Sequence, residues 1–431
     1  METEIGVMSS ALNYSNMVPR YTDLRHGRFS RHLPVNTISN ATTINFNLTP
    51  SEDYLDPQEC FVVIDLKITK ADGTNLVEAD NVAFADNIAF SIFKSVNLYL
   101  NNVNIAPSSV YLPYANFIAT YFGTNKAASK IHLRHLQGLT GEAAGKHDGK
   151  NADATGWSAR KEWTALSKTL RLVAQIPHDF FRSCSTFVTP MQDIRLEFKL
   201  SDADFALVGA AGPFSYKLEG MELMARYVKV DPSVTMGIVK QQAIKPLNLN
   251  FTHLETQSFS IPAGKAVENI RGIFPHGMPN QVFLMLVETD RINGVQTKEP
   301  FKFENGRVEK IILRQDGETV MIDSMKSRFE DATLDAKVAY YMFLQGLDLG
   351  NSSRDVNLTY EQFSSGLTVW IWTLNPDMDA QSGVSLVQKP ANFEADIYIK
   401  AGHNNPALTA LFVGKFGKTV LLGKDNIVTV I

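Results

Sequence analysis

Residues 87–122 read NIAFSIFKSVNLYLNNVNIAPSSVYLPYANFIATYF, and the pattern in this stretch changes midway from that of a strand to that of a helix. Apolar residues alternate with others over 96–100, the two-residue period of a strand with one face in a core. Asn101 and Asn102 tolerate the left-handed backbone that a two-residue hairpin turn needs. Apolar side chains then recur every three or four positions over 111–121, which is typical of a helix. The stretch therefore predicts a β-hairpin beside a packing helix.

The same order of patterns recurs about 200 residues further along the chain, a period that indicates two similar domains. One match between strand patterns is weak evidence, but five matches in order predict a tandem duplication. The matched pairs are Ile44–Leu48 with Gln257–Ile261, Phe61–Ile68 with Val282–Val287, Lys94–Ile105 with Val308–Val320, Tyr114–Ile118 with Tyr340–Leu344, and Pro190–Lys199 with Pro390–Lys400.

Length and turn signals together predict an all-β protein of two domains. The chain has 431 residues, more than one hydrophobic core usually serves, and many short strands bounded by turns favour sandwiches or barrels. We expect an irregular N-terminal arm over 1–35, a first domain over 36–235 and a second over 236–431. Residues 231–246 would link the domains, and the Gly-, Ala- and Lys-rich residues 123–165 would form a long surface loop.

Composition excludes several classes of protein. The formal net charge is -4 and 44% of residues are hydrophobic, which does not favour a generally basic nucleic-acid binder. Cys60 and Cys184 are the only cysteines, so a disulfide-stapled fold is not expected. The sequence starts without a signal-peptide pattern and has no apolar stretch near the length of a membrane span.

The expected arm carries a cluster of basic and titratable side chains that allows two interpretations. It can be a solvated terminus without a special role, or it can dock on a neighbouring subunit or contact nucleic acid. The cluster consists of Arg20, Arg25, His26, Arg28, Arg31 and His32.

Two groups of residues resemble catalytic motifs or nucleotide-binding motifs, and for each a purely structural role is the better interpretation. Gly414–Thr419, GKFGKT, resembles the end of a phosphate-binding loop, but Phe412 stands where that loop needs its first glycine, and a strand pattern follows. His178, Asp179 and Cys184 suggest a thiol–imidazole pair, yet no catalytic signature surrounds them. We interpret Cys184 as a buried structural cysteine.

The remaining candidates lie in a predicted loop and a predicted strand. His132 and His135, with His147 and Asp148, could bind a metal, but they lie in the loop-like region without a nearby cysteine, so a solvated loop is the better interpretation. Trp370 and Trp372 would share one face of a strand, where core or interface packing is commoner than a sugar platform. We therefore assign no catalytic, cofactor or metal residue.

Two motifs resemble the double jelly-roll major capsid proteins of Maverick/Polinton elements and adintoviruses. Leu-Tyr-Leu-Asn-Asn at 98–102, followed by Pro-Tyr-Ala-Asn-Phe-Ile at 113–118, is similar to a strand and helix of that family. Within 280–303, an Asp-x-x-x-Gly-x-x-x-x-x-Pro-Phe-x-Phe run matches the family's pattern, with Glu299 where the family often has Asn. The resemblance covers the chain from about residue 40 onward.

The resemblance implies a fold and a function. It implies two tandem eight-stranded jelly rolls with short helices and a long loop insertion. Three chains would form a pseudo-hexagonal capsomer that tiles the icosahedral shell of a DNA virus or virus-like mobile element. The partners would be two further copies, neighbouring capsomers, a minor penton-type capsid protein and, through the arm, packaged DNA. The protein would be assembled inside the host cell, would reside in the virion capsid, and would need no cofactor.

One alternative function comes from a different class. A tandem β-sandwich protein that binds carbohydrate or hydrolyses a substrate would share the fold class, because jelly rolls serve lectins, enzymes and capsids alike. Such a protein would need convergent carboxylates or aromatics in a concave site, and the sequence contains no such constellation.

Overall fold

The computed structural model describes most of the chain. The described residues are 23–39, 41–149, 155–210, 212–320, 325–326, 329, 336–350, 352, 354–375, 392–400 and 405–431.

The first half of the described chain forms two four-stranded antiparallel sheets. One sheet has the order β1 (Leu24–His32), β10 (Phe214–Val230), β3 (Tyr54–Lys70) and β7 (Leu170–Gln175). The other has the order β2 (Thr43–Leu48), β8 (Ile194–Leu200), β5 (Phe93–Leu100) and β6 (Val103–Asn104). A short additional pair joins β4 (Val82–Phe84) to β9 (Leu207–Gly209).

The second half repeats this arrangement. One sheet has the order β11 (Leu247–Ile261), β19 (Leu408–Leu422), β13 (Gln281–Glu288) and β17 (Val369–Thr373), with β20 (Val428–Val430) paired to β19. The other has the order β12 (Val267–Ile270), β18 (Phe393–Ile399), β14 (Val308–Gln315) and β15 (Glu318–Thr319), with β16 (Met325–Lys326) paired to β14.

The two halves have the same topology. Leaving aside β4 and β9 in the first half and β16 and β20 in the second, the strands of each half taken in chain order lie as 1-8-3-6 in one sheet and 2-7-4-5 in the other. Two such facing sheets, linked by Greek-key connections, make a jelly roll. The predicted duplication of an all-β domain is confirmed at the level of strand order.

One of the five predicted matches is wrong. Ile44–Leu48 lies in β2, whose counterpart is β12, whereas Gln257–Ile261 lies in β11, the counterpart of β1. Alternating patterns in neighbouring strands look alike, because they report only that one face of each strand is buried. The other four matches fall on corresponding strands or, for Tyr340–Leu344, on a helix at the corresponding place in the chain.

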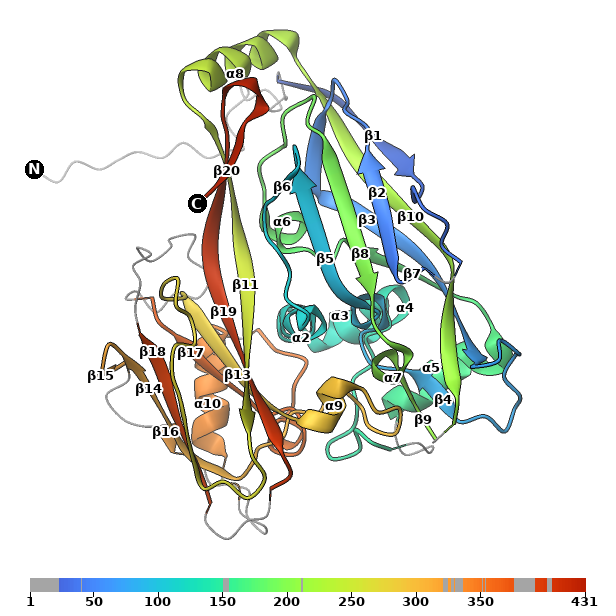
Figure 1. Cartoon of the computed structure of the whole chain (residues 1–431), viewed down its shortest axis with the longest axis vertical. Coiled ribbons are helices and arrows are strands. Elements are labelled where there is room, and N and C mark those ends of the chain that lie inside the picture. Colours follow the sequence, from blue (N-terminus) through green and yellow to red (C-terminus); the bar gives the residue numbers. More distant parts are fainter. Residues whose placement is uncertain are drawn as a thin grey trace, which may run out of the picture.

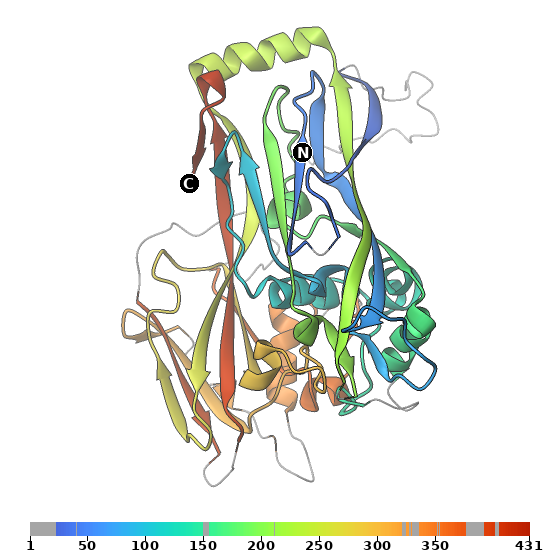
Figure 2. The same cartoon turned by 45° about the vertical axis from the view of Figure 1, so that its right-hand side comes forward.

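Short helices fill the connections. They are α1 (Ile88–Ser91), α2 (Leu112–Phe117), the π-helical turns η2 (Ile118–Phe122) and η3 (Ser129–Leu133), α3 (Lys126–Ala128), α4 (Arg134–Gln137), α5 (Thr155–Thr164), η4 (Ala165–Ser167), α6 (Asp179–Ser183), α7 (Ala203–Ala206), α8 (Pro232–Ile244), α9 (Thr289–Asn293), α10 (Lys337–Gly346), α11 (Tyr360–Ser364) and η5 (Lys424–Asn426). The expected link at 231–246 is α8, which crosses one end of the molecule between the halves (Figures 1 and 2).

Two predictions about irregular segments are corrected. Residues 123–165 are not only a surface loop, because they include α3, α4 and α5, and Leu139 and Trp157 are buried. Leu139 and Trp157 are not part of a helical repeat of apolar residues, so the hydrophobic pattern of the sequence did not predict their burial. Residues 24–32 are not an irregular arm, because they form β1, and β1 pairs over its whole length with the C-terminal part of β10. Backbone pairing holds this strand although its side chains are mostly exposed.

The predicted hairpin turn at Asn101 and Asn102 is confirmed, and the second half has a hairpin turn at the corresponding place. Asn101 and Asn102 join β5 to β6 with φ of 49° and 65°. Asp316 and Gly317 join β14 to β15 with φ of 51° and 85°. All four are in the left-handed region that this hairpin turn requires.

The two halves share their cores. The first barrel's core includes Leu249 and Phe251 of β11, together with Val420 and Leu422 of β19. These long strands therefore cover the first barrel with one end and build the second barrel with the other, as Figure 1 shows. In the opposite direction, α2 and η2 pack into the core of the second half. The seam between the barrels is thus formed by both halves.

Candidate functional site

The seam has an aromatic part, which α2 supplies. Phe117 stacks on Phe301 with ring centroids 4.8 Å apart and an angle of 8° between the planes. The ring of Tyr114 lies edge-on to Phe301 at 5.6 Å, and Phe303 meets Phe117 edge-on at 5.5 Å. The helical spacing that the sequence predicts places Tyr114 and Phe117 on one side, and that side is buried against the second half.

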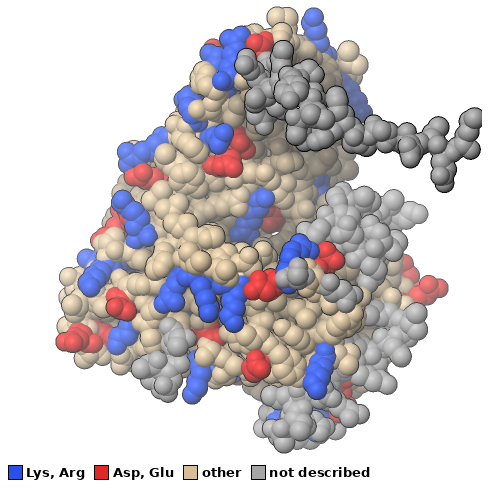
Figure 3. All heavy atoms as spheres, turned by 180° about the vertical axis from the view of Figure 1, so that it is seen from behind, with Lys and Arg blue, Asp and Glu red and all other residues tan. Residues whose placement is uncertain are grey.

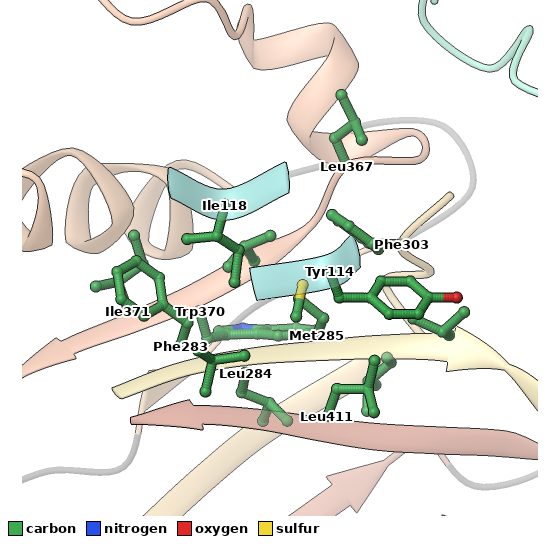
Figure 4. Packing of buried hydrophobic residues seen from close by; sticks show 14 of the residues in the cluster. Tyr114, Ile118, Phe283, Leu284, Met285, Phe303, Leu367, Trp370, Ile371 and Leu411 are labelled. Carbon is green, nitrogen blue, oxygen red and sulfur yellow. The ribbon is translucent and has the colours of Figure 1, made fainter. Parts of the chain in front are cut away.

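The same helix reaches into the sheet of the second barrel. Figure 4 shows Tyr114 and Ile118 pointing from α2 and η2 toward Met285 of β13 and Trp370 of β17. All four side chains are buried. Burying a side chain of this size contributes roughly 1.5–3 kcal/mol, so the helix holds the two barrels together as one body.

The seam also has an ionic part, centred on Arg160 of α5. Its guanidinium is fully buried and lies 2.8 Å from Glu142, 3.0 Å from Glu299 and 3.7 Å from Asp86. Its Nε donates to the carbonyl of Phe84 at 2.7 Å. Glu299 comes from the second half of the chain and the other groups from the first, so this cluster joins the halves.

Burial, together with the excess of carboxylates over cations, shifts the pKa values of Glu299 and Glu142. Burial raises the pKa of Glu299 to about 8, with Glu142 and Asp86 adding to the effect and Arg160 opposing it. Burial likewise raises the pKa of Glu142. Burial alone would lower the pKa of Arg160, but the surrounding carboxylates outweigh it and raise that pKa. Near neutral pH the cluster therefore holds a proton on Glu299.

A second ion pair extends the seam. The Arg291 guanidinium donates to both oxygens of Asp148, at 2.6 and 2.8 Å, and to the carbonyl of Glu299 at 2.9 Å. Asp148 also accepts from the backbone N–H of Glu299 at 3.0 Å. These contacts, with burial opposing them, lower the pKa of Asp148. Arg291 is buried but Asp148 is 37% exposed, so the pair is only partly buried and fixes geometry more than it adds stability.

The structure separates the four metal candidates. His132 lies on η3 and His135 on α4, whereas Asp148 belongs to the seam. His147 is buried, burial lowers its pKa to about 4, and neither ring nitrogen has a hydrogen-bond partner. The interpretation of His147 as part of a solvated loop is therefore wrong, whereas the side chain of Asp148 is 37% exposed. No group of three His, Cys, Asp or Glu side chains is placed to hold a metal in the described part of the chain.

The expected neighbours His178 and Asp179 have separate partners. His178 Nε2 lies 3.0 Å from the carbonyl of Ala106. Asp179 Oδ2 lies 2.9 Å from His253 Nδ1, and it accepts from the backbone N–H of Leu254 at 2.8 Å. His253 and Leu254 lie on β11, so Asp179 is a further contact across the seam. Sequence adjacency did not reveal it.

The remaining candidates are structural. Cys184 is buried, and burial raises its pKa to about 11, which disfavours the nucleophilic thiolate. Gly414–Thr419 lies within β19, which continues to Leu422, so no phosphate-binding loop with a following helix is formed here. Trp370 and Trp372 of β17 are buried in the core and offer no exposed platform.

The basic side chains of the expected arm have acidic partners in the same chain. Arg25 pairs with Asp231 at 2.9 Å and Arg28 with Asp53 at 3.1 Å, while Arg31 pairs with Glu222. His26 and His32 belong to the same strand, β1. Arg20, with the rest of 1–22, lies outside the described residues. These pairs neutralise the part of the cluster on β1, which disfavours its use as a nucleic-acid contact.

Sequence reasoning missed Arg160, Arg291 and their carboxylate partners. One signal was available, because Asp86 interrupts the apolar run VAFADNIAF at 82–90. A charge in such a run is rarely buried without a partner. The identity of the partner was not readable, because Arg160 and Glu299 are 139 residues apart.

Comparison with known proteins gives fold-level matches only. No family model and no curated protein matches the sequence. Among solved structures, the cryo-EM structure of the Sputnik virophage matches with a TM-score of 0.67 and 12% identity, covering 99% of this chain and 92% of that chain. The PBCV-1 virus capsid matches with a TM-score of 0.59 and 10% identity, covering 97% of this chain and 98% of that chain. The mavirus major capsid protein matches with a TM-score of 0.56 and 9% identity, covering 99% of this chain and 95% of that chain.

These matches agree with the strand order on the fold. In the described residues, no helix has both the length and the apolar character to cross a membrane. Both barrels, the helices between them and nearly the full length of the chain align with the viral structures. The chain therefore has the double jelly-roll fold, which confirms the fold class that the sequence predicted.

Proposed function

We propose that this protein is a structural protein of a viral capsid and acts there as the major capsid protein. The observation that carries the proposal is the alignment of 97% or more of the chain with double jelly-roll structures, among them a virus capsid and a major capsid protein. The seam agrees with a building block, because its aromatic and ionic contacts hold the barrels in one fixed orientation. The clusters in it are buried, and a catalytic centre would need access to substrate.

Three chains would form one capsomer. Each chain carries two barrels of the same strand order, so three chains around a threefold axis present six similar barrels, a pseudo-hexagonal outline that can tile an icosahedral shell. Closed symmetry repeats one interface and covers exposed sheet edges.

We place the two domains on either side of α8, which contains the boundary at 235/236, and we assign β1 to the first domain.

The lineage and partners complete the proposal. We infer a DNA virus or virus-like mobile element related to Maverick/Polinton elements or adintoviruses, from the motifs at 98–118 and 280–303. The capsomers would contact one another and a minor penton-type capsid protein, in a virion assembled inside the host cell. Residues 1–22 would contact a neighbouring subunit or packaged DNA.

Light scattering combined with electron microscopy tests the proposal. Purified full-length protein is expected to elute at three times the mass of the chain, and negative-stain images are expected to show particles with threefold or pseudo-hexagonal outlines. A stable, well-folded monomer across the micromolar range would contradict the proposed capsomer, because shell subunits need interfaces of roughly 1,200 Å² or more in total.

A further inference from the structure

A cleft of about 720 Å³ lies between the two barrels, and both halves line it. The first half contributes η2, the turn after it, and α6. The second half contributes β11, β13, Lys415 of β19 and four residues beyond α10: Leu347, Leu349, Arg354 and Asp355. Its volume is within the range of roughly 300–1,000 Å³ that is usual for small-molecule sites. One part of the wall is apolar and consists of Ile118, Phe122, Phe283, Leu347 and Leu349.

Arg182 of α6 lines this cleft as a cation without a counter-ion. Its side chain makes no hydrogen bond or ion pair with the described residues, and its Nη1 is buried without a partner. The guanidinium carbon lies 4.7 Å from the ring centroid of Phe90, a contact that only partly replaces water. Burial lowers the pKa of Arg182 to about 10, with only Asp179 opposing the effect. An anion beside Arg182 would remove this deficit.

The acidic groups of the cleft do not supply that anion. Asp179 is occupied by His253 and by the backbone of Leu254. Arg354, a further cation at the cleft, is paired with Asp348 at 3.2 Å. Asp355 also lines the cleft but makes no ion pair with Arg182 among the described contacts. Lys415 adds positive charge on the side of the second half.

Figure 3 shows the face of the molecule opposite to that of Figure 1. This face is hollowed near its middle, and several Lys and Arg side chains, with a few Asp and Glu, lie around the hollow. Positive charge at the mouth of a concave site raises the local concentration of anions.

We propose that the cleft binds an amphiphile with a single anionic head group, a carboxylate or phosphate, and a short apolar chain. The head group pairs with Arg182, and the chain lies against the wall that includes Ile118, Phe122 and Leu349. A charge-assisted hydrogen bond gives the head group its preference for this end. The site is contained within one chain, so it is independent of the proposed role in a shell.

Calorimetric titration of the full-length protein tests this proposal. The probes are octanoate, which carries charge and chain, acetate, which carries the charge alone, and 1-octanol, which carries the chain alone. We expect octanoate to bind once per chain and about tenfold or more tightly than either of the others. Equal binding of octanoate and 1-octanol, or no binding of octanoate at millimolar concentration, would overturn the proposal.

Matched variants locate the site. Arg182→Met keeps an unbranched side chain on Phe90 and should weaken octanoate binding about tenfold, the effect of one lost charge-assisted hydrogen bond. Arg195→Met is the control, because Arg195 also lies over a ring, that of Tyr99 at 4.7 Å, but does not line the cleft. The Arg195→Met variant should bind octanoate with the same affinity as the wild type.

A second variant covers the case in which Arg182→Met does not fold. Leu349→Glu places a carboxylate in the half-buried part of the wall, where it should repel the head group and weaken octanoate binding by a similar factor. Wild-type affinity in either folded variant would contradict the assignment of the cleft.

Discussion

The guanidinium of Arg160 and the carboxylate of Glu299 lie 3.0 Å apart at full burial, and they come from opposite halves of the chain. Their contact closes the seam between the two jelly rolls on one side, as the stacking of Phe117 on Phe301 closes it on another. A chain that has to keep two barrels in one orientation benefits from such a contact, because a buried hydrogen bond from a charged guanidinium tolerates only a narrow range of geometries.

Removing the cation from this cluster should destabilise the protein severely. Arg160→Met leaves Asp86 and Glu142 without a counter-ion and removes the hydrogen-bond donor to Glu299, and breaking a buried pair in this way costs about 3–5 kcal/mol. Urea unfolding followed by circular dichroism measures the change. Arg171→Met is the matched control, because Arg171 is 69% exposed in its pair with Asp65 and should contribute no more than about 1 kcal/mol. Equal effects of the two substitutions would refute the role of the buried cluster.

The stability of the protein should fall as pH rises toward 8. The pKa of Glu299 is about 8 in the folded protein against a reference value of 4.5, so between these values the folded state binds a proton that the unfolded state has lost. The stabilisation that Glu299 contributes is fully present below its pKa in the unfolded chain and is lost as the pH rises through its pKa in the folded protein. Between these two values the free energy of unfolding should fall by up to about 1.4 kcal/mol per pH unit.

Glu299→Gln isolates this effect. The amide stays uncharged at every pH, so the free energy of unfolding of the variant should depend less on pH between 7 and 8.5 than that of the wild type. His147, whose pKa is lowered to about 4 in the folded protein, is present in both proteins, so its contribution cancels when the two pH profiles are compared. Parallel pH profiles for the two proteins would show that Glu299 carries no such proton.

Gly366 should not tolerate a side chain. A Cβ on this residue would lie 2.4 Å from Cε1 of His147, and its φ of +137° is strained for other residues. Gly366→Ala should cost about 1–3 kcal/mol from overpacking alone. Gly237→Ala in α8 meets no atom within 4 Å and should stabilise by about 0.5–1 kcal/mol. Thermal melts of both variants would show shifts of opposite sign if this packing is correct.

The hairpin at Asn101 and Asn102 should respond differently at its two positions. Both residues have a left-handed backbone that glycine adopts without strain. Asn102→Gly should therefore be neutral or stabilising, by up to about 1 kcal/mol. Asn101→Gly should destabilise, because the Asn101 side chain bonds Gln192 and the carbonyl of Asn426. If both substitutions stabilised the protein in urea melts, the side-chain contacts of Asn101 would be unimportant.

Local features of the fold could be predicted from local sequence. Alternation over 96–100, the turn at Asn101 and Asn102, and the helical spacing over 111–121 each depend on residues a few positions apart. Repetition of these features in order gave the duplicated all-β architecture. The same patterns could not tell Ile44–Leu48 from other strands, because one-sided burial gives every such strand the same alternation.

The seam was decided only by the tertiary structure. Arg160 and Glu299 are far apart in the sequence. No periodic pattern in a sequence identifies a charged residue that is buried because it pairs with one distant residue. His147 and Trp157 lie in a segment of loop-like composition, yet both are buried once the second half packs against it. The sequence alone determined the alternating strands, the hairpin turn at Asn101 and Asn102 and the order in which these patterns repeat, but not β1 or the helices within 123–165. Their packing across the two halves determined which charges lost contact with water, because burial and ion pairing depend on residues brought together from distant parts of the chain.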